Sequence, residues 1–366
     1  MIKILHFIHG LYTGGAETLV KEYVSSLNKN KFAVMVLCYD KYDNSPYETI
    51  LENNGIKVCN IYRDNRFGKL GIIFNLIRQR IIIKKVIKDF NPDIIHSHLL
   101  INTYVKFAHP KKGTKIFHTV HSEPSAYWGN GKNKRDFNAA KWLVKHYGMQ
   151  FIVLHEDMKN EVNKLFNVDN SLVLKNGINF DRFENALSKA DVRKKIGIPQ
   201  NAFVLGHVGR FTDVKNHEFI IKVFEKLCKE KENAFLLLIG DGSLKQKIEE
   251  ELKERSLENR FLILSNRSDI PDLLNAMDCF IFPSKYEGLG ISLIEAQKMK
   301  LPCVVSDKVP RFAQISNLTS WHSLNEPIEN WVNSICNFHP SEITYEHLED
   351  WNMKNVIKKL EDIYEQ

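Results

Sequence analysis

The sequence predicts an α/β protein made of two doubly wound domains, and three observations lead to this prediction. The chain has 366 residues, which is too long for one ordinary domain and suits two. Short apolar runs alternate with amphipathic helical stretches, as they do in parallel sheets covered by helices on both faces. The alternation occurs in two series, which meet near a turn signal at Asn176-Gly177.

Each series contains strands and helices in turn. Strands of the first series are expected at 2–8, 33–39, 57–61, 93–97, 115–120 and 150–154, with helices at, for example, 16–27, 72–89 and 137–147. The second series has strands at 203–208, 234–239, 260–264, 279–282 and 303–306, and helices at 216–229, 243–255, 270–276 and 292–299. With a last helix at about 352–364, we expect domains at 1–178 and 179–345, and a closing segment at 346–366 that crosses back to the first domain.

Composition is typical of a globular protein, with 43% hydrophobic and 26% charged residues. The longest apolar stretch, 70–83, is interrupted by polar residues, so no transmembrane span is predicted. The six cysteines form no C-x-x-C pair, which argues against a zinc site and a disulfide framework. Buried thiols in a reducing cytoplasm are the simplest interpretation.

Charge is unevenly distributed along the chain. Residues 1–180 contain 26 Lys and Arg against 15 Asp and Glu, whereas the remaining residues contain 25 against 29. A basic first half and a mildly acidic second half indicate that the first half meets an anionic partner. Phospholipid, a lipid diphosphate and nucleic acid each fit this pattern.

Ligands of open parallel sheets bind beyond the carboxyl ends of the strands, so functional residues are expected in the loops that follow strands. The first strand leads into a loop with Gly14 and Gly15, just before a helix whose free N–H groups suit a phosphate or a sugar hydroxyl. A tight strand-to-helix turn is the alternative. The dinucleotide spacing G-x-G-x-x-G is absent from this loop.

Two further loops carry charged residues. After the strand at 203–208, Gly209 is followed by Arg210 and Lys215, cations suited to a diphosphate or, alternatively, to solvent. After the strand at 279–282, Glu287 and Glu295 lie eight positions apart, with glycines and a helix start between them. The alternative for this segment is a capped helix with two chance acids.

Histidines follow two strands of the first series. His121 lies just past a strand end, where it could bond a sugar hydroxyl or take part in acid–base chemistry. His96 and His98 end the preceding strand and are weaker candidates. Taken alone, each could be a structural histidine, and no third ligand for a metal ion is identifiable.

These motifs, in this order, resemble the large retaining family 4 of glycosyltransferases, which has the GT-B fold. The resemblance is carried by Gly14-Gly15-Ala16-Glu17, His121, Asn176-Gly177-Ile178, Gly209-Arg210, Lys215-Asn216, Ile239-Gly240-Asp241-Gly242, Glu287-x7-Glu295 and residues 301–307. It covers nearly the whole chain and is most specific from Gly206 to Asp307. The second half is particularly similar to bacterial transferases that build exopolysaccharide, capsule and lipopolysaccharide chains.

The resemblance implies two Rossmann-like domains facing across a cleft and a nucleotide-sugar donor, UDP-linked by family frequency. It implies that Arg210 and Lys215 hold the donor diphosphate, Glu295 the ribose and Glu287 the donor sugar. The other implied contacts are Gly288, Leu289 and Gly290 with the distal phosphate, Gly209 with the donor, the backbone of Asn266 and Arg267 with the base, Gly15 with the donor phosphates or the acceptor, Gly14 and His98 with the acceptor, and His121 with the transferred sugar.

We therefore expect a retaining, metal-independent hexosyltransferase with no cofactor, acting on a lipid-linked or saccharide acceptor. The absence of a D-x-D motif agrees with metal independence. Alternatives are a catalytically silent GT-B partner subunit and a nucleic-acid-binding protein, although no nucleic-acid recognition motif is found. A phosphorylase of the same fold would need a pyridoxal phosphate lysine or a phosphate acceptor site, and neither is found.

An anionic membrane surface is a further expected partner. The helix at 72–89 carries basic residues beside apolar ones: Arg78, Arg80, Lys84, Lys85 and Lys88. Anionic lipid attracts such residues by about 1 kcal/mol each. We expect a cytoplasmic protein, peripheral on the inner face of the cell membrane, and the alternative is an ordinary solvated helix face.

Overall fold

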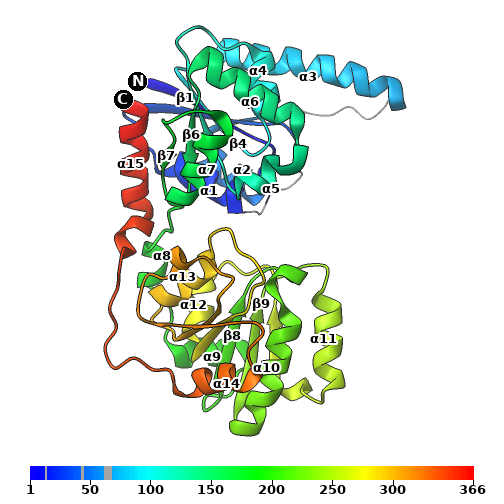
Figure 1. Ribbon diagram of the computed structural model, residues 1–366, viewed down its shortest axis with the longest axis vertical. Helices are drawn as coiled ribbons and strands as arrows, with labels where there is room; N and C mark the ends of the chain where they lie inside the picture. Colours follow the sequence, from blue (N-terminus) through cyan, green and yellow to red (C-terminus); the bar gives the residue numbers. More distant parts are fainter. Residues whose placement is uncertain (13–14, 43–44, 62–67) are drawn as a thin grey trace. The chain divides into compact units, whose positions relative to one another are not determined.

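The computed structural model describes residues 1–12, 15–42, 45–61 and 68–366, and for residues 68–74, 76 and 130 it describes the backbone alone. The chain forms two compact units (Figure 1). The first comprises Met1–Gly177 together with Asp350–Gln366, and the second comprises Ile178–Glu349. The expected domain boundaries lay one residue later at the first junction and four residues earlier at the second.

A sheet of seven parallel strands forms the centre of the first unit, in the order β3-β2-β1-β4-β5-β6-β7. The strands are β1 (Ile2–Ile8), β2 (Phe32–Cys38), β3 (Lys57–Asn60), β4 (Ile94–His98), β5 (Lys115–Thr119), β6 (Gln150–Val153) and β7 (Leu172–Val173). The helices are α1 (Gly15–Ser26), α2 (Pro46–Asn53), α3 (Gly68–Phe90), α4 (Asn102–Ala108), α5 (Pro124–Trp128), α6 (Lys134–Tyr147), α7 (Glu156–Phe166) and α15 (Met353–Glu365).

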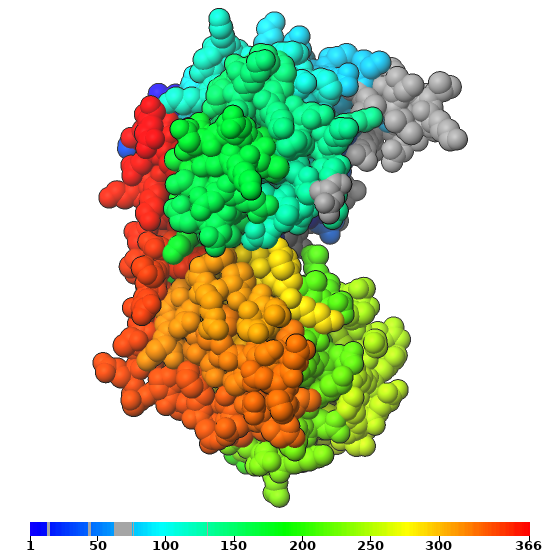
Figure 2. Space-filling view, viewed as in Figure 1, coloured from blue at the N-terminus to red at the C-terminus, as the bar shows by residue number. Residues whose placement is uncertain are grey.

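Helices cover both faces of this sheet, because alternate side chains of each strand point to opposite faces. On one face, α1 and α15 share an apolar cluster with residues of β1, β4, β5 and β6, such as Ile4 and Ile152. On the other face, Phe151 of β6 packs against Phe166 of α7, with ring centroids 4.5 Å apart. The last helix, red in Figure 2, therefore completes the core of the unit in which the chain begins.

The second unit is built around six parallel strands in the order β10-β9-β8-β11-β12-β13. These are β8 (Phe203–Val208), β9 (Ala234–Ile239), β10 (Phe261–Leu264), β11 (Cys279–Phe282), β12 (Cys303–Ser306) and β13 (Thr319–His322). The helices are α8 (Asp181–Glu184), α9 (Lys189–Ile196), α10 (His217–Glu230), α11 (Lys245–Glu254), α12 (Ile270–Asn275), α13 (Ile291–Lys298) and α14 (Ile328–Asn337). Helices α10, α11 and α14 share one apolar cluster with the sheet, and α13 packs on β11 and β12.

Both units therefore have the Rossmann-like architecture that the sequence predicts. Among the elements that were not predicted are β7 in the first unit and α8, α9, β13 and α14 in the second. None of the helices within the described residues is long and apolar enough to cross a membrane. All six cysteines carry free thiols.

Candidate functional site

In the second unit, the loop after β8 brings a cation close to the backbone. The Gly209 N–H donates to the carbonyl of Ile239 at 2.9 Å, which continues the ladder one residue past the strand. A Cβ on Gly209 would lie 2.7 Å from Nε2 of His207 and 3.3 Å from Cδ of Lys215. Glycine is thus required here so that the Lys215 side chain can pass close over the backbone.

Lys215 and Glu287 form an ion pair that joins the loops after β8 and β11. Nζ of Lys215 donates to Oε1 of Glu287 at 2.5 Å, and the two side chains are 18% and 10% exposed. The same ammonium lies 4.9 Å from the centre of the Phe282 ring. The backbone N–H of Lys285 also donates to the carbonyl of Val214 at 2.8 Å. The ion pair and this backbone hydrogen bond therefore hold the two loops together.

Arg210 follows Gly209 in the loop after β8. Its side chain is exposed, and it makes no hydrogen bond or ion pair with any described residue. A guanidinium with all its donors available can bind two oxygens of a phosphate at once.

Helix α13 begins in the glycine-rich turn after Glu287. Gly290 precedes the helix with φ 67°, a conformation that favours glycine, and no side chain caps the first turn. Gly288 has open space where a side chain would be, while Leu289 is buried. Uncapped backbone N–H groups at a helix start suit an anion.

Glu295 lies in the second turn of α13. Its carboxylate is partly buried and has no hydrogen-bond partner among the described residues. Burial raises the pKa of Glu295 to about 7, and the positive charge of Arg182 opposes this shift. A carboxyl group in this state can accept hydrogen bonds from ligand hydroxyls.

The loop after β10 uses its side chains locally. Asn266 has φ 54°, and the guanidinium of Arg267 donates to both oxygens of Asp269, at 2.8 Å and 2.5 Å. Ser265 donates to the carbonyl of Gly240 and accepts from Lys245, both at 2.8 Å. The backbone of Asn266 and Arg267 is the part of this loop that stays available for a ligand.

In the first unit, Gly15 is the first residue of α1, and a Cβ added there would meet nothing within 4 Å. Gly14 lies outside the described residues, so its expected acceptor contact has no structural counterpart here.

His121 lies two residues beyond β5, and it is joined to His98 at the end of β4. Nε2 of His121 and Nδ1 of His98 are 3.1 Å apart, and Nε2 of His98 and Nδ1 of His6 are 3.0 Å apart. His98 is fully buried, and both of its ring nitrogens are engaged. His98 is therefore joined to His121 on one side and to His6 on the other. A direct contact between His98 and an acceptor would require His98 to break one of these two hydrogen bonds.

A cavity of about 870 Å³ opens in the first unit beside α4 and α6. Four of its lining residues are cations that form no ion pair with a described residue: Arg80, Lys106, Lys134 and Arg135. The other lining residues are apolar or aromatic, such as Tyr104 and Phe107, or polar, and one acidic residue, Asp136, is among them. The arrangement suits an anionic group attached to an apolar one.

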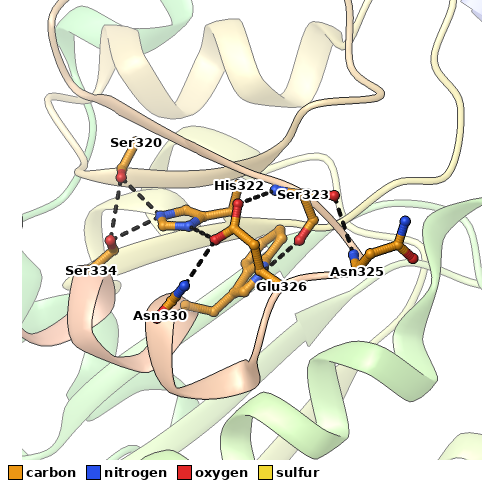
Figure 3. Close-up of polar contacts among 8 residues, drawn as sticks. Ser320, His322, Ser323, Asn325, Glu326, Asn330 and Ser334 are labelled. Atoms are coloured by element: carbon orange, nitrogen blue, oxygen red, sulfur yellow. Dashed lines mark hydrogen bonds and ion pairs between the residues drawn. The ribbon is translucent and has the colours of Figure 1, made fainter.

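A Ser–His–Glu arrangement at β13 has a different character (Figure 3). Nδ1 of His322 lies 3.0 Å from Glu326, and its Nε2 lies 3.0 Å from Ser320 and 2.9 Å from Ser334. A nucleophilic triad activates one serine, whereas here serines from β13 and α14 share one nitrogen. The cluster joins the edge strand to the helix, and we assign it a structural role.

Residues 13–182 match the family described as Glycosyltransferase Family 4, and residues 188–329 match the family described as Glycosyl transferases group 1. EpsF of Bacillus subtilis (strain 168), a protein named as a glycosyltransferase, is 30% identical over 343 residues, which is 91% of this chain and 87% of EpsF.

A second curated relative is the UDP-Gal:alpha-D-GlcNAc-diphosphoundecaprenol alpha-1,3-galactosyltransferase of Escherichia coli. It is 29% identical over 242 residues, 63% of this chain and 62% of the relative. The crystal structure of Anabaena Alr3699/HepE in complex with UDP matches with a TM-score of 0.76 at 17% identity, covering 100% of both chains. The chain belongs to the glycosyltransferases and has the GT-B fold.

Proposed function

We propose that this protein is a retaining, metal-independent glycosyltransferase. It would transfer a sugar from a UDP-sugar to a lipid-linked or saccharide acceptor in the synthesis of a surface polysaccharide. The observation that carries the proposal is the set of groups at the carboxyl edge of the second sheet: Arg210, the Lys215–Glu287 pair, and an uncapped α13 followed by Glu295.

These groups match the parts of a nucleoside diphosphate sugar. Arg210, Lys215 and the first turn of α13 would bind the diphosphate and stabilise the charge that develops as it leaves. Glu295 would accept hydrogen bonds from the ribose. Glu287 would orient the sugar and offset positive charge on its ring, and ligand binding would then compete with the Lys215–Glu287 bond. With the charge compensated in this way, the diphosphate needs no cofactor or metal ion.

UDP as the nucleotide is supported by two names: the HepE complex contains UDP, and the Escherichia coli relative is named for UDP-Gal. Retention is supported by the resemblance to family 4, and we propose same-face attack in which the donor phosphate assists removal of the acceptor proton.

The test combines kinetics with product analysis. Arg210→Ala should lower turnover by about a hundredfold, the size of effect expected when a charge-stabilising donor is removed. Lys285→Ala is the matched control, because Lys285 lies in the same pair of loops but is bonded to Asp213. Wild-type activity should survive EDTA, and NMR should show an α-linked product from an α-linked donor. A β-linked product, full activity of Arg210→Ala, or loss of all activity in EDTA would each count against the corresponding part.

The acceptor is proposed to be an anionic lipid conjugate that meets the first unit at a membrane surface. The Escherichia coli relative is named for an acceptor that carries diphosphoundecaprenol. The cavity beside α4 and α6 provides matching chemistry, with four cations that form no ion pair with a described residue and with aromatic side chains such as Tyr104 and Phe107. On α3, Ile77 and Ile81 are 53% and 63% exposed one turn apart, close to the exposed Lys84 and Lys85. Such a face suits the surface of an anionic bilayer.

Vesicle flotation tests this contact. The protein should bind vesicles containing anionic lipid, release at high salt, and bind more weakly after Lys84→Glu/Lys85→Glu. The control is Lys229→Ala/Lys247→Ala, which removes two exposed cations of the second unit. Equal, negligible binding to neutral and anionic vesicles would instead favour a saccharide acceptor in solution.

A further inference from the structure

A chain of buried hydrogen bonds leads from His121 into the core of the first unit. It passes through His98 to His6 by the bonds of 3.1 Å and 3.0 Å described above. Nε2 of His6 then lies 3.5 Å from the hydroxyl of Tyr364, which α15 brings to this face of the sheet.

The chain continues from Tyr364 to its far end. The Tyr364 hydroxyl lies 2.5 Å from Nδ1 of His96, and Nε2 of His96 lies 2.7 Å from Oγ1 of Thr119. Each of these five hydrogen bonds joins one atom of a residue to one atom of the next residue in the series. We name this series the histidine chain: His121, His98, His6, Tyr364, His96 and Thr119.

The sheet geometry explains why these side chains meet. His6 of β1 and His96 of β4 are paired in register, so their side chains lie next to each other on one face. His98 follows two residues after His96 and shares that face. The ring centroids of His96 and His98 are 4.3 Å apart. Helix α15 covers the same face and places Tyr364 against them.

The bonds of the histidine chain all run in one direction if the Tyr364 hydroxyl, like each ring, donates one bond and accepts the other. Burial lowers the pKa of His6 to about 3 and that of His121 to about 4, so the rings are neutral near pH 7. A neutral imidazole has one N–H donor and one acceptor nitrogen. A ring that accepts from one neighbour therefore donates to the next, and the choice made at one end is passed to the other.

Thr119 fixes that direction. It is buried, and His96 is its hydrogen-bond partner among the described residues. If the chain donated toward Thr119, the hydroxyl proton of Thr119 would be buried without an acceptor among the described residues, which is unfavourable. If Thr119 donates to His96 instead, every donor in the chain except the Nδ1–H of His121 has an acceptor within it, and His121 is the partly exposed end of the chain. The proton at the other end then resides on Nδ1 of His121, which has no partner among the described residues.

We propose that the histidine chain holds His121 as the Nδ1–H tautomer, so that His121 presents a hydrogen-bond donor to an oxygen of the substrate. The use of that donor rests on the proposed function, whereas the tautomer does not. His6, His96, His98 and Tyr364 are positioning residues in this scheme.

A metal site is the main competing interpretation, because ligand atoms of His6, His96 and His98 all lie within 4.8 Å of one another. Two observations favour the hydrogen-bonded chain. Every ring nitrogen of the three already has a partner in the chain. The rings of His96 and His98 are stacked, with 29° between their planes, whereas metal ligands converge on one point.

NMR of the full chain labelled with 15N-histidine tests the tautomer directly. Long-range 1H–15N spectra at pH 7.5 distinguish the protonated nitrogen of each ring, and His121→Gln assigns the His121 signals. We expect a proton on Nδ1 of His121 and also of His6, His96 and His98. A proton on Nε2 of His121 would overturn the proposal, and so would one equivalent of Zn²⁺ that binds and shifts the signals of His6, His96 and His98 together.

Tyr364→Phe then breaks the chain in the middle. His121 should become a mixture of tautomers, and kcat should fall about tenfold with little change in the KM for the donor. Tyr23→Phe is the matched control, because Tyr23 is buried in the same apolar cluster and its hydroxyl has no hydrogen bond to a described residue. An unchanged tautomer in Tyr364→Phe would refute the chain. Absence of sugar transfer in the wild type, with the Nδ1–H tautomer present, would refute only the proposed function.

Discussion

The carboxyl edges of the two sheets carry opposite kinds of polar groups. In the second unit this edge is charged, with the Lys215–Glu287 pair, a carboxyl at Glu295, and an Arg210 side chain that has no partner among the described residues. In the first unit the corresponding edge carries imidazoles that burial keeps neutral. The same strand topology thus supports two chemistries.

The difference follows from how well each edge can stabilise a charged side chain. Charges at the second edge sit in loops and at a helix start, where solvent, a counter-charge or a ligand stabilises them. At the first edge, His96 and His98 lie on β4 under helix α15, where an unpaired charge would be costly, so neutral donors and acceptors are used. Charged groups suit a diphosphate, and neutral ones suit sugar hydroxyls.

The largest expected effect of this difference is on stability in acid. Five histidines of the first unit have lowered pKa values because they are buried: His6, His96, His98, His118 and His121. Below about pH 6.5 these histidines bind protons in the unfolded chain but stay neutral in the folded protein. The free energy of unfolding should therefore be level above pH 6.5 and fall below it, by up to about 1.4 kcal/mol per pH unit for each histidine.

Hydrogen exchange at pH 7.5 and pH 5.5 can separate the two units. Strands β1, β4 and β5 should open earlier at the lower pH, while the second unit, with the lowered pKa values of His207 and His217, should respond less. His217→Phe should reduce the response of the second unit further, since this ring stacks on Phe211 and neither of its nitrogens has a hydrogen-bond partner among the described residues. Equal loss of protection in both units would contradict the comparison.

Much of the fold could be predicted from the sequence because its strands are short apolar runs. For three elements of the second unit that were not predicted, the structure gives a physical reason. Strand β13, Thr-Ser-Trp-His, is polar and lies at the edge of the sheet. Helix α9 is mostly charged, and it packs on α12 through few residues such as Val192. Helix α14 buries only Trp331, Val332 and Ile335.

The charged edge was also accessible from the sequence, because charge, glycine and a helix start follow each other within a few residues. The histidine chain was not. Its bonds depend on strand register and on Tyr364, which lies 268 residues from its partner His96. One signal was present: His6 and His96 both fall near the ends of predicted strands. Deciding that these strands are neighbours requires the sheet order.

A smaller effect is expected at Glu295. With a pKa raised to about 7, the carboxyl is charged above pH 7 and protonated below it. If it accepts hydrogen bonds from a ribose, affinity for UDP-glucose should rise several-fold from pH 6 to pH 8, within the limit of about tenfold per pH unit for one proton. Calorimetry can measure this, and UDP-glucose is suitable because its phosphates do not titrate in this range.

Two variants sharpen this measurement. Glu295→Gln should bind UDP-glucose more weakly and without the pH dependence. Arg182→Met removes the charge that opposes the shift, so the midpoint should move to higher pH. A pH profile that persists unchanged in Glu295→Gln would assign the titration to another group.

The smallest expected effect concerns Glu326 in the second unit. Hydrogen bonds from His322 and from the backbone of Ser323 lower the pKa of Glu326 to about 2 (Figure 3). Its stabilising contribution is complete above the ordinary pKa of about 4.5 and is lost as the pH falls toward 2. Because the carboxylate is 33% exposed, we expect Glu326→Gln to lower the free energy of unfolding by about 1 kcal/mol or less at pH 7.

Urea unfolding of the second unit at pH 7 and pH 4 measures this effect. The difference in stability between the wild type and Glu326→Gln should be smaller at pH 4. Glu329→Gln is the control, since Glu329 pairs with Lys226 at the surface and should leave unfolding unchanged. If Glu326→Gln instead made the second unit as acid-sensitive as the first, the contrast between the two units would not rest on their buried histidines.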